Sequence, residues 1–371
     1  MNYYIIAGEA SGDLHASNLI KELKDLDTAA HFRCWGGDLM KAQGAELVKH
    51  YRDLAFMGFT EVLMNLRTIF KNIDFCKKDI LDHKPDVLIL VDYPGFNLRI
   101  AEFAKQNAIK VFYYISPQVW AWKQSRVHKI KKIVDKMFVI LPFEKEFYQQ
   151  FNYDVDFVGH PLLDATVNFS TQENTFQINS KKPIIALLPG SRKQEIKTML
   201  PLMLTMYKHY PNYQFVIAGA PSQTEDFYKS LYSNSDIQIV FNQTYQLLQK
   251  SEAALVTSGT ATLETALFNV PEVVCYKGGA ISYAIAKQLV KVKFISLVNL
   301  IMDKEIVKEL IQKELNEINL KIELDKLLAL KSREIMLNEY SELRAKLGNS
   351  GASKKTASLI IAYLTNPTDT N

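Results

Sequence analysis

Cysteine and long apolar segments are scarce in this sequence, and each absence narrows the class of protein. The three cysteines among 371 residues, Cys34, Cys76 and Cys275, have neither paired nor metal-ligand spacing, so we interpret them as buried thiols of a reducing cytoplasm. No apolar run approaches the about 20 residues that a membrane-spanning helix needs, and no secretory signal is recognisable. We therefore expect a cytoplasmic protein whose membrane contact is peripheral.

Excess charge and metal-ligand patterns are missing as well. The formal net charge of +4 excludes a typical nucleic-acid-binding protein but permits attraction to an anionic lipid or substrate. The seven histidines show no ligand spacing and no His-x-x-x-His occurs, so neither a metal nor another cofactor is predicted. An apolar content of 48% and a charged content of 23% are typical of a folded globular protein.

Short apolar runs alternate with segments of helical period, a pattern typical of parallel sheets with helical crossovers. Strands are predicted at 3–7, 32–35, 86–91, 111–115, 137–141 and 156–158 in the first half, and at 184–188, 214–218, 237–240, 253–256 and 273–276 in the second. Beyond about Asp303 the composition predicts helices, the last of which covers 352–364.

The rhythm of strands and helices restarts after a polar stretch, 168–175, that we interpret as a linker. The sequence thus predicts an α/β protein of two doubly wound Rossmann-like domains that face a cleft, 1–168 and 180–345. Residues 346–371, a helix and a polar tail, are expected to pack back on the N-terminal domain. Ligands bind such sheets at the carboxyl ends of the strands, so the loops there hold the candidate site.

In the second half, two turns between a strand and a helix have the residues of an anion site. Gly190, Ser191 and Arg192 follow a buried strand, where free backbone N–H groups, the helix dipole and a guanidinium all favour phosphate oxygens. Taken alone, this is equally an ordinary turn with a surface arginine. A second turn of the same kind favours a bound nucleotide diphosphate.

That second turn contains Ser258, Gly259 and Thr260, whose hydroxyl and N–H groups suit phosphate at a helix N-terminus. Glu264 lies one helical turn further on and is predicted to accept hydrogen bonds from ribose hydroxyls. The alternative is a Ser/Thr cap with a stabilising glutamate.

In the first half, a glycine turn at residues 8–13 opens the first helix without the G-x-G-x-x-G spacing of dinucleotide folds. Glu9, Ser11 and His15 gather at the edge of the sheet, and we expect them to bind an acceptor substrate. The alternative is a capped helix start.

Asp92 ends the apolar strand 87–91 and is the candidate general base, although a helix-capping aspartate is the alternative.

Two segments combine apolar and basic side chains in an unusual way. Trp120 and Trp122 lie in a loop that leads into a basic stretch, 123–132, which suits an acyl chain, a phosphorylated lipid or an anionic membrane surface. Residues 54–73 contain an amphipathic helix pattern and further apolar side chains, which suits an acceptor pocket or a membrane-docking surface. Core packing and a solvated basic face are the alternatives.

With these pieces in place, the chain resembles the lipid-A-disaccharide synthases, inverting glycosyltransferases of the glycosyltransferase-B fold. The resemblance rests on six motifs in the same order, namely Ala7–Asp13, Met57–Leu63, Ser116–Trp122, Leu141–Lys145, Leu187–Arg192 and Ser258–Glu264.

The resemblance implies UDP-2,3-diacylglucosamine as donor, 2,3-diacylglucosamine 1-phosphate as acceptor, and a β-1,6-linked disaccharide 1-phosphate and UDP as products. It also implies a metal-independent reaction in lipid A biosynthesis, with the N-terminal domain holding the acceptor and the C-terminal domain holding UDP. In this family pattern Asp92 and Arg192 are catalytic, Trp120 belongs to an acceptor-side motif, and Asn299 matches a nucleotide-side asparagine. Peripheral contact with the cytoplasmic face of the anionic inner membrane would follow.

Three positions depart from the family pattern. Gly95 replaces a second acid near Asp92, Val298 replaces the proline before the asparagine, and the residue after His160-Pro161 differs. Two rival functions stay open at this point, a UDP-N-acetylglucosamine 2-epimerase and a non-catalytic peripheral lipid-binding protein. The helical C-terminal part is also compatible with a homodimer.

Overall fold

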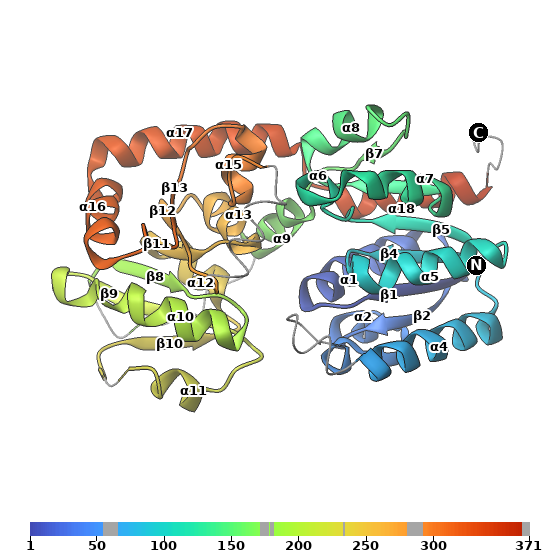
Figure 1. The fold of residues 1–371 in the computed structure, drawn as a ribbon, viewed down its shortest axis with the longest axis horizontal. Helices are drawn as coiled ribbons and strands as arrows, with labels where there is room; N and C mark the ends of the chain where they lie inside the picture. Colours follow the sequence, from blue (N-terminus) through green and yellow to red (C-terminus); the bar gives the residue numbers. More distant parts are fainter. Residues whose placement is uncertain (55–65, 171–177, 179–181, 233, 280–291, 366–371) are drawn as a thin grey trace. The chain divides into compact units, whose positions relative to one another are not determined.

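The structure, a computed structural model, describes residues 1–54, 66–170, 178, 182–232, 234–279 and 292–365 (Figure 1). It divides the chain into two units, one comprising Met1–Asp164 and the C-terminal segment from Asn349, the other comprising Ala165–Gly348. The domain limits drawn from the sequence, 168 and 345, lie a few residues from these boundaries. Most of the segment interpreted as a linker lies outside the described residues.

Seven parallel strands form the sheet of the first unit, in the order β3-β2-β1-β4-β5-β6-β7. The strands are β1 (Asn2–Ala7), β2 (His31–Gly36), β3 (Glu46–His50), β4 (Val87–Val91), β5 (Lys110–Tyr114), β6 (Lys136–Val139) and β7 (Asp156–Phe157). β4 is buried along its whole length, as is β1 after its first residue, because helices cover both faces of a parallel sheet.

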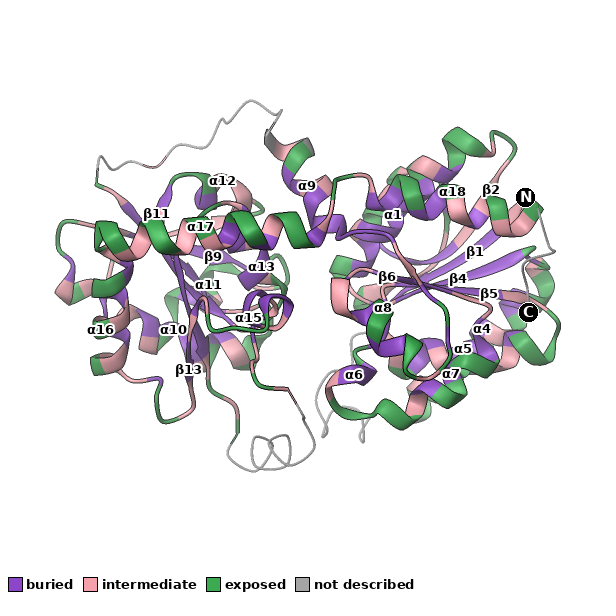
Figure 2. Ribbon diagram, turned by 90° about the horizontal axis from the view of Figure 1, so that it is seen from above, coloured by how far each residue is buried: buried purple, intermediate pink, exposed green. Residues whose placement is uncertain are grey.

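Figure 2 shows α1 and α18 on one side of this sheet and α4, α5 and α7 on the other. The helices of the first unit are α1 (Ala10–Leu26), α2 (Asp38–Ala42), the 3-10 turn η1 (Tyr51–Asp53), α4 (Leu66–His83), α5 (Pro94–Gln106), α6 (Val119–Trp122), the 3-10 turn η2 (Gln124–Arg126), α7 (Val127–Ile133), α8 (Pro142–Gln149) and α18 (Ala352–Thr365). A further helix, α9 (Pro161–Ser170), runs across the boundary between the units.

The C-terminal helix α18 is part of the first unit. It packs on α1, and Ala357 and Ile360 are fully buried in the same core as β1 and β4. The carboxylate of Asp164 accepts hydrogen bonds from the backbone N–H groups of Gly351 and Ser353, at the start of the helix. The last helix of the chain therefore stabilises the unit that the first residues begin.

Six parallel strands form the sheet of the second unit, in the order β10-β9-β8-β11-β12-β13. The strands are β8 (Ile184–Leu188), β9 (Gln214–Gly219), β10 (Gln238–Phe241), β11 (Ser251–Thr257), β12 (Glu272–Tyr276) and β13 (Lys308–Ile311). The helices are α10 (Lys193–Leu204), the 3-10 turn η3 (Tyr207–His209), α11 (Glu225–Lys229), α12 (Thr244–Gln249), α13 (Thr260–Leu267), α15 (Leu297–Met302), α16 (Glu317–Leu328) and α17 (Leu330–Leu347).

The structure corrects the sequence prediction at two edge strands. β3 was not predicted, and β13 lies in a region for which only helices were predicted. Both strands contain charged residues. An edge strand pairs with only one neighbouring strand, and charged residues are common on such edges. Hydrophobic patterning therefore fails to mark them, while it marks the central strands clearly.

Candidate active site

The turn after β4 places Asp92 in an unusual backbone conformation. Asp92 and the following Tyr93 have φ angles of 45° and 48°, in the left-handed region that side chains rarely adopt. Three hydrogen bonds hold the Asp92 backbone there: its N–H donates to Tyr114 O (3.1 Å), and its carbonyl accepts from Asn97 Nδ2 (2.7 Å) and from the Tyr113 hydroxyl (2.5 Å). Two consecutive strained residues held in this way are typical of a functional site.

The environment of Asp92 changes its acidity. Burial raises the pKa of its carboxyl to about 7, and the nearby Glu9 carboxylate adds to the rise, while the Tyr93 N–H opposes it. A carboxylate with a pKa near neutrality accepts a proton more effectively than an ordinary aspartate. The geometry and electrostatics of Asp92 thus suit a general base at the carboxyl end of a central strand.

Gly8 lies directly beside this turn. β1 and β4 are paired with Ala7 opposite Val91, so the residues that follow the two strands are neighbours. The ring of Tyr93 covers Gly8 so closely that a Cβ built there would lie 2.3 Å from ring atoms. Glycine is therefore required at this position by the close approach of Tyr93.

The three residues predicted to bind the acceptor occupy different environments. Glu9 is the N-cap residue of α1 and interacts electrostatically with Asp92, whereas Ser11 is exposed in the first turn of that helix. His15 is only 6% exposed, and burial lowers the pKa of its imidazole to about 4. Burial lowers the pKa of the His160 imidazole to about 3, and the nearby His15 adds to this shift. Glu9 and Asp92 are thus brought together, while His15 lies inside the unit.

Trp120 is placed differently from the sequence expectation of an acceptor-lining side chain. It is 8% exposed, its indole N–H donates to Glu144 Oε1 (3.3 Å), and Phe143 packs edge-on against the ring. These contacts give it a structural role in the loop after β5. The exposed tryptophan of the loop is Trp122, and the cationic groups of Lys123 and Arg126 lie 4.7 and 5.0 Å from the centre of its ring.

The apolar segment 54–73 lies largely outside the described residues, as does the family motif Met57–Leu63. In the described part, Leu54 and Ile73 are buried and Phe70 is 54% exposed. The predicted pocket or docking surface at this segment stays a prediction.

In the second unit, the turn after β8 has the predicted form. Gly190 has a φ of 107°, which favours glycine, and Arg192 is the N-cap residue of α10. Arg192 Nη1 bonds Glu195 Oε1 (2.9 Å), and Glu195 Oε2 accepts from the Arg192 backbone N–H (3.3 Å). Ser191 and the guanidinium are exposed, and the arginine side chain retains 56% of its accessible surface. The turn thus presents cationic and N–H donors to solvent.

In the turn after β11, Gly259 and Thr260 face open space, whereas Ser258 is held by a hydrogen bond. A Cβ built at Gly259, where φ is 156°, would meet no atom within 4 Å, and Thr260 is exposed at the start of α13. The Ser258 hydroxyl donates to Ile295 O (2.9 Å), so it serves as an anchor and does not offer its proton to phosphate as expected. An anion here would bind to the first N–H groups of α13.

Glu264 lies one turn further along α13. Its Oε1 accepts a hydrogen bond from the Tyr245 hydroxyl of α12 (2.9 Å), and burial raises the pKa of its carboxyl. Tyr245 therefore orients the carboxylate that the sequence analysis assigned to the ribose hydroxyls.

Asn299, which the resemblance placed in the nucleotide-binding set, lies in a buried hydrogen-bond network. The residue is fully buried, its Nδ2 donates to Val307 O (2.8 Å) and Glu309 Oε1 (2.9 Å), and its Oδ1 accepts from the N–H groups of Ile306 and Val307. A primary amide offers two donors and two acceptor lone pairs, so the protein itself occupies all of them. Asn299 thus organises the loop around it, and its predicted contact with a nucleotide stays a prediction.

The departures from the family pattern are structurally tolerated. Gly95 is exposed in the first turn of α5, and a Cβ there would meet no atom within 4 Å, so a side chain at this position would lie in open space. Val298 is fully buried in α15, and His160 accepts the Leu162 N–H at its Nδ1 (3.2 Å).

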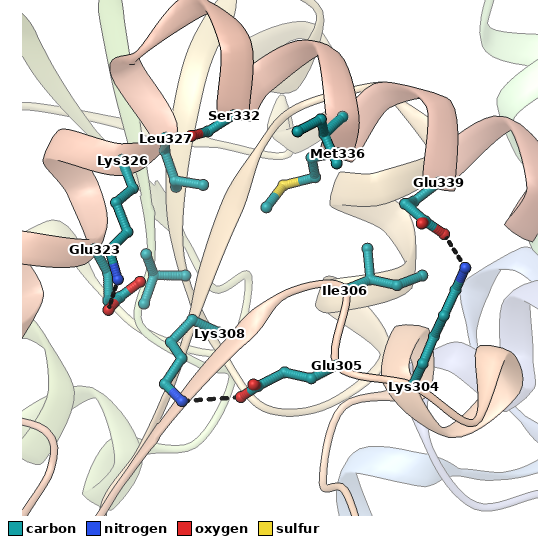
Figure 3. Close-up of a pocket in the computed structure, with 12 residues that line it drawn as sticks. Lys304, Glu305, Ile306, Lys308, Glu323, Lys326, Leu327, Ser332, Met336 and Glu339 are labelled. Carbon is teal, nitrogen blue, oxygen red and sulfur yellow. Dashed lines mark hydrogen bonds and ion pairs between the residues drawn. The ribbon is translucent and has the colours of Figure 1, made fainter.

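A cavity of about 470 Å³ in the second unit lies away from these turns, near the amino end of β13 (Figure 3). Ile306, Leu327 and Met336 contribute apolar side chains to its lining. Its charged side chains are matched in ion pairs, which are Lys304–Glu339, Lys308–Glu305 and Lys326–Glu323. No sequence-predicted site residue lines this cavity, and the matched charges favour no particular ligand.

The model of a family described as lipid-A-disaccharide synthetase matches residues 3–362. The lipid-A-disaccharide synthase of Syntrophus aciditrophicus is 40% identical over 371 residues, covering 97% of each chain, and lipid-A-disaccharide synthase 1 of Legionella pneumophila is 38% identical with the same coverage.

Solved structures with low identity share the fold. The UDP-GlcNAc 2-epimerase from Neisseria meningitidis bound to UDP-GlcNAc has a TM-score of 0.66 at 16% identity and covers 97% of this chain and 100% of its own. The calicheamicin glycosyltransferase CalG4 has a TM-score of 0.63 at 14% identity and covers 99% and 98%. The α/β fold with two Rossmann-like units predicted from the sequence is confirmed, and the likeness to epimerases is one of fold alone.

Proposed function

The chain belongs to the lipid-A-disaccharide synthase family, and from this premise we propose that it transfers diacylglucosamine from UDP-2,3-diacylglucosamine to 2,3-diacylglucosamine 1-phosphate. The products are the β-1,6-linked lipid A disaccharide 1-phosphate and UDP. The observation that carries the chemical step is Asp92, a carboxyl with a pKa of about 7 at the end of a central strand.

In the proposed reaction, Asp92 removes the proton of the acceptor 6-hydroxyl as its oxygen attacks the anomeric carbon of the donor. Attack occurs on the face opposite UDP, so the bond to the diphosphate oxygen breaks while the new glycosidic bond forms, and the configuration inverts. Burial, to which the Glu9 carboxylate adds, raises the pKa of Asp92 toward the range that suits this proton transfer. Glu9, Ser11 and His15 belong to the acceptor side of this proposal.

The negative charge that develops on the departing UDP is stabilised by the second unit. Arg192 uses Nη1 for its bond to Glu195, and because a guanidinium carries five N–H donors, others can bind the diphosphate while that bond is kept. The N–H groups of Gly190 and Ser191 and those at the start of α13 add fixed donors. These groups take the electrostatic role that a divalent metal has in other transferases, and Glu264 binds the ribose.

The test is an assay of purified protein in detergent with both lipid substrates and excess EDTA, read by mass spectrometry. The proposal predicts disaccharide 1-phosphate and UDP in equal amounts, with no product when the acceptor is omitted. Conversion of UDP-N-acetylglucosamine without an acceptor would instead support an epimerase. Loss of all product in EDTA, with recovery on adding Mg²⁺, would overturn metal independence.

We further propose peripheral contact with the anionic cytoplasmic face of the inner membrane. Among the described helices, none is both long and apolar enough to cross a bilayer. Trp122, with Lys123 and Arg126 beside its exposed ring, combines interfacial aromatic and cationic groups. The double substitution Lys123→Glu/Arg126→Glu should reduce co-sedimentation with phosphatidylglycerol vesicles but leave binding to phosphatidylcholine vesicles unchanged. Equal binding of the variant and the wild type to the anionic vesicles would contradict this surface.

A homodimer through the helical C-terminal part is a separate proposal. Leu330 and Ile335 on α17 are 79% and 56% exposed, and Ile318 on α16 is 72% exposed, so apolar surface is available there. Light scattering of the wild type and of Leu330→Glu tests it: a dimer that the substitution converts to monomers supports the pairing, and an unchanged mass contradicts it.

A further inference from the structure

Glu309, on the edge strand β13, is the centre of a buried hydrogen-bond network. Its side chain is 6% exposed, and its Oε1 accepts from the backbone N–H and the hydroxyl of Ser296 (2.9 and 2.8 Å) and from Asn299 Nδ2 (2.9 Å). Its Oε2 accepts from the N–H of Ile295 (2.9 Å). One carboxylate therefore fixes two consecutive backbone positions and a side chain at the start of α15.

Asn299 extends this network in the other direction. Through its Nδ2 and Oδ1 it bonds the backbone of Ile306 and Val307, directly before β13. The Ser296 hydroxyl also accepts the N–H of Asn299 (3.3 Å) as the cap of α15. Hydrogen bonds thus join the two ends of the segment from Ile295 to Glu309. Neither end can move relative to the other without breaking buried hydrogen bonds.

The network reaches the candidate diphosphate turn through the backbone carbonyl of Ile295. Ile295 O accepts the hydrogen bond of the Ser258 hydroxyl (2.9 Å), and the Ser258 N–H donates to Cys275 O of β12 (3.1 Å). Ser258 is thus held on one side by the sheet and on the other by the segment that Glu309 braces. Gly259 and Thr260, whose N–H groups begin α13, follow it directly.

We propose that Glu309 is a positioning residue for binding of the nucleotide diphosphate. By fixing Ile295, it fixes the carbonyl that anchors Ser258, and thereby the direction of the N–H groups that follow. Donors that are already oriented bind an anion without the entropy cost of ordering a loop, so loosening the anchor weakens binding even though Glu309 touches no ligand. This inference rests on the proposed function, since it requires that the Ser258 turn binds the diphosphate of UDP.

The experiment is calorimetric titration of UDP into the wild type, Glu309→Gln and a control, Glu305→Gln. In Glu309→Gln an NH2 group replaces one carboxylate oxygen and points at groups that are themselves hydrogen-bond donors. UDP should therefore bind about tenfold more weakly, while the KM of the acceptor substrate is unchanged. Glu305 is exposed, pairs with Lys308 at the start of β13 (2.9 Å), and should have wild-type affinity when substituted.

A milder variant and a double substitution separate positioning from loss of fold. Ser296→Ala removes one donor to Glu309 and should weaken UDP binding about threefold. The same hydroxyl caps α15, so the melting temperature should fall modestly, and UDP binding is compared at matched folded fraction. If Glu309→Gln does not fold, the UDP affinity of Ser296→Ala tests the positioning role instead. Ser258→Ala should weaken binding less in the Glu309→Gln background than in the wild type, because both substitutions break the same anchor.

The outcomes separate the two proposals. Wild-type protein that does not bind UDP would overturn the proposed function and this inference with it. Wild-type protein that binds UDP, together with folded Glu309→Gln or Ser296→Ala of unchanged affinity, would overturn the inference alone. Strictly additive effects of Ser258→Ala and Glu309→Gln would do the same.

Discussion

The turn after β4 and the turns after β8 and β11 all follow central strands of their sheets but are built in opposite ways. Asp92 lies in a strained, hydrogen-bonded backbone, and burial raises its pKa to about 7. Arg192 and Thr260 are exposed, and the Arg192 side chain keeps 56% of its accessible surface. A proton acceptor needs an environment that changes its pKa, whereas an anion site needs oriented donors that a ligand can reach.

The largest effect expected from this comparison is that of Asp92→Asn. The amide cannot accept the proton, so kcat should fall on the order of 10³-fold, while UDP affinity stays at the wild-type value. The substitution should also raise the melting temperature at pH 8. The folded-state pKa of Asp92 lies above its unfolded value, so ionisation at high pH destabilises the fold, and the amide removes that cost.

Steady-state kinetics, UDP calorimetry and thermal melts at pH 5 and pH 8 check these three expectations. Near-normal turnover of Asp92→Asn would remove Asp92 from the chemical step. A melting temperature that rises equally at both pH values would contradict the pKa assignment.

The second effect concerns the exposed turn. Arg192→Ala should lower kcat/KM for the UDP donor about 10²-fold by removing charge stabilisation of the leaving diphosphate, with the acceptor KM little changed. Lys193→Ala, at the next and equally exposed position, is the matched control and should be close to wild type. If both variants lose the same activity, general positive charge is responsible and the guanidinium has no specific role.

A third prediction tests how tightly the buried turn is packed. Gly8→Ala places a Cβ against the ring of Tyr93, which must shift with the Asp92 turn, so kcat should fall about tenfold. Gly95→Ala, two residues after Tyr93, adds its Cβ to open space and should leave kcat unchanged. Kinetics of both variants at matched folded fraction make the comparison. Equal kcat in the two would show that the packing around Asp92 is looser than described.

The smallest effect is a shift of the pH profile. kcat/KM should rise as Asp92 loses its proton, with an apparent pKa of about 7. In Glu9→Gln the neighbouring negative charge is gone, so the pKa of Asp92 falls and the rising limb moves to lower pH. The ratio of rates at pH 6 and pH 8 measures this directly. A limb that stays in place would indicate that Glu9 has no influence on the base.

The sequence predicted more of the fold than of the candidate site. β1, β4, β8 and β11 are central strands, and their apolar runs marked them because both faces of a central parallel strand are buried. The family was indicated by motifs in order, and the comparisons confirm it. The roles of Asp92, Arg192 and the other site residues stay predictions that the experiments above address.

Residues that support the site were missed for a different reason. Tyr93, Asn97 and Tyr113 hold the Asp92 turn, but an aromatic or an asparagine near a strand end is too common to stand out. Glu309 lies in a stretch whose composition predicted helices, whereas the structure places it on β13. Its spacing from Asn299 carries no motif, because the contact depends on how β13 and α15 pack.

The sequence alone predicts the alternation of strands and helices, the two glycine turns of the second unit and the aspartate at the end of β4. These follow from local chemistry, since apolar periodicity, backbone freedom at glycine and the position of a charge after a strand are properties of neighbouring residues. Only the tertiary structure decided which polar groups are left for a ligand. Asn299 donates to Glu309 and Trp120 donates to Glu144, in each case a residue of another element, and a donor is not available to a substrate while such a bond is kept.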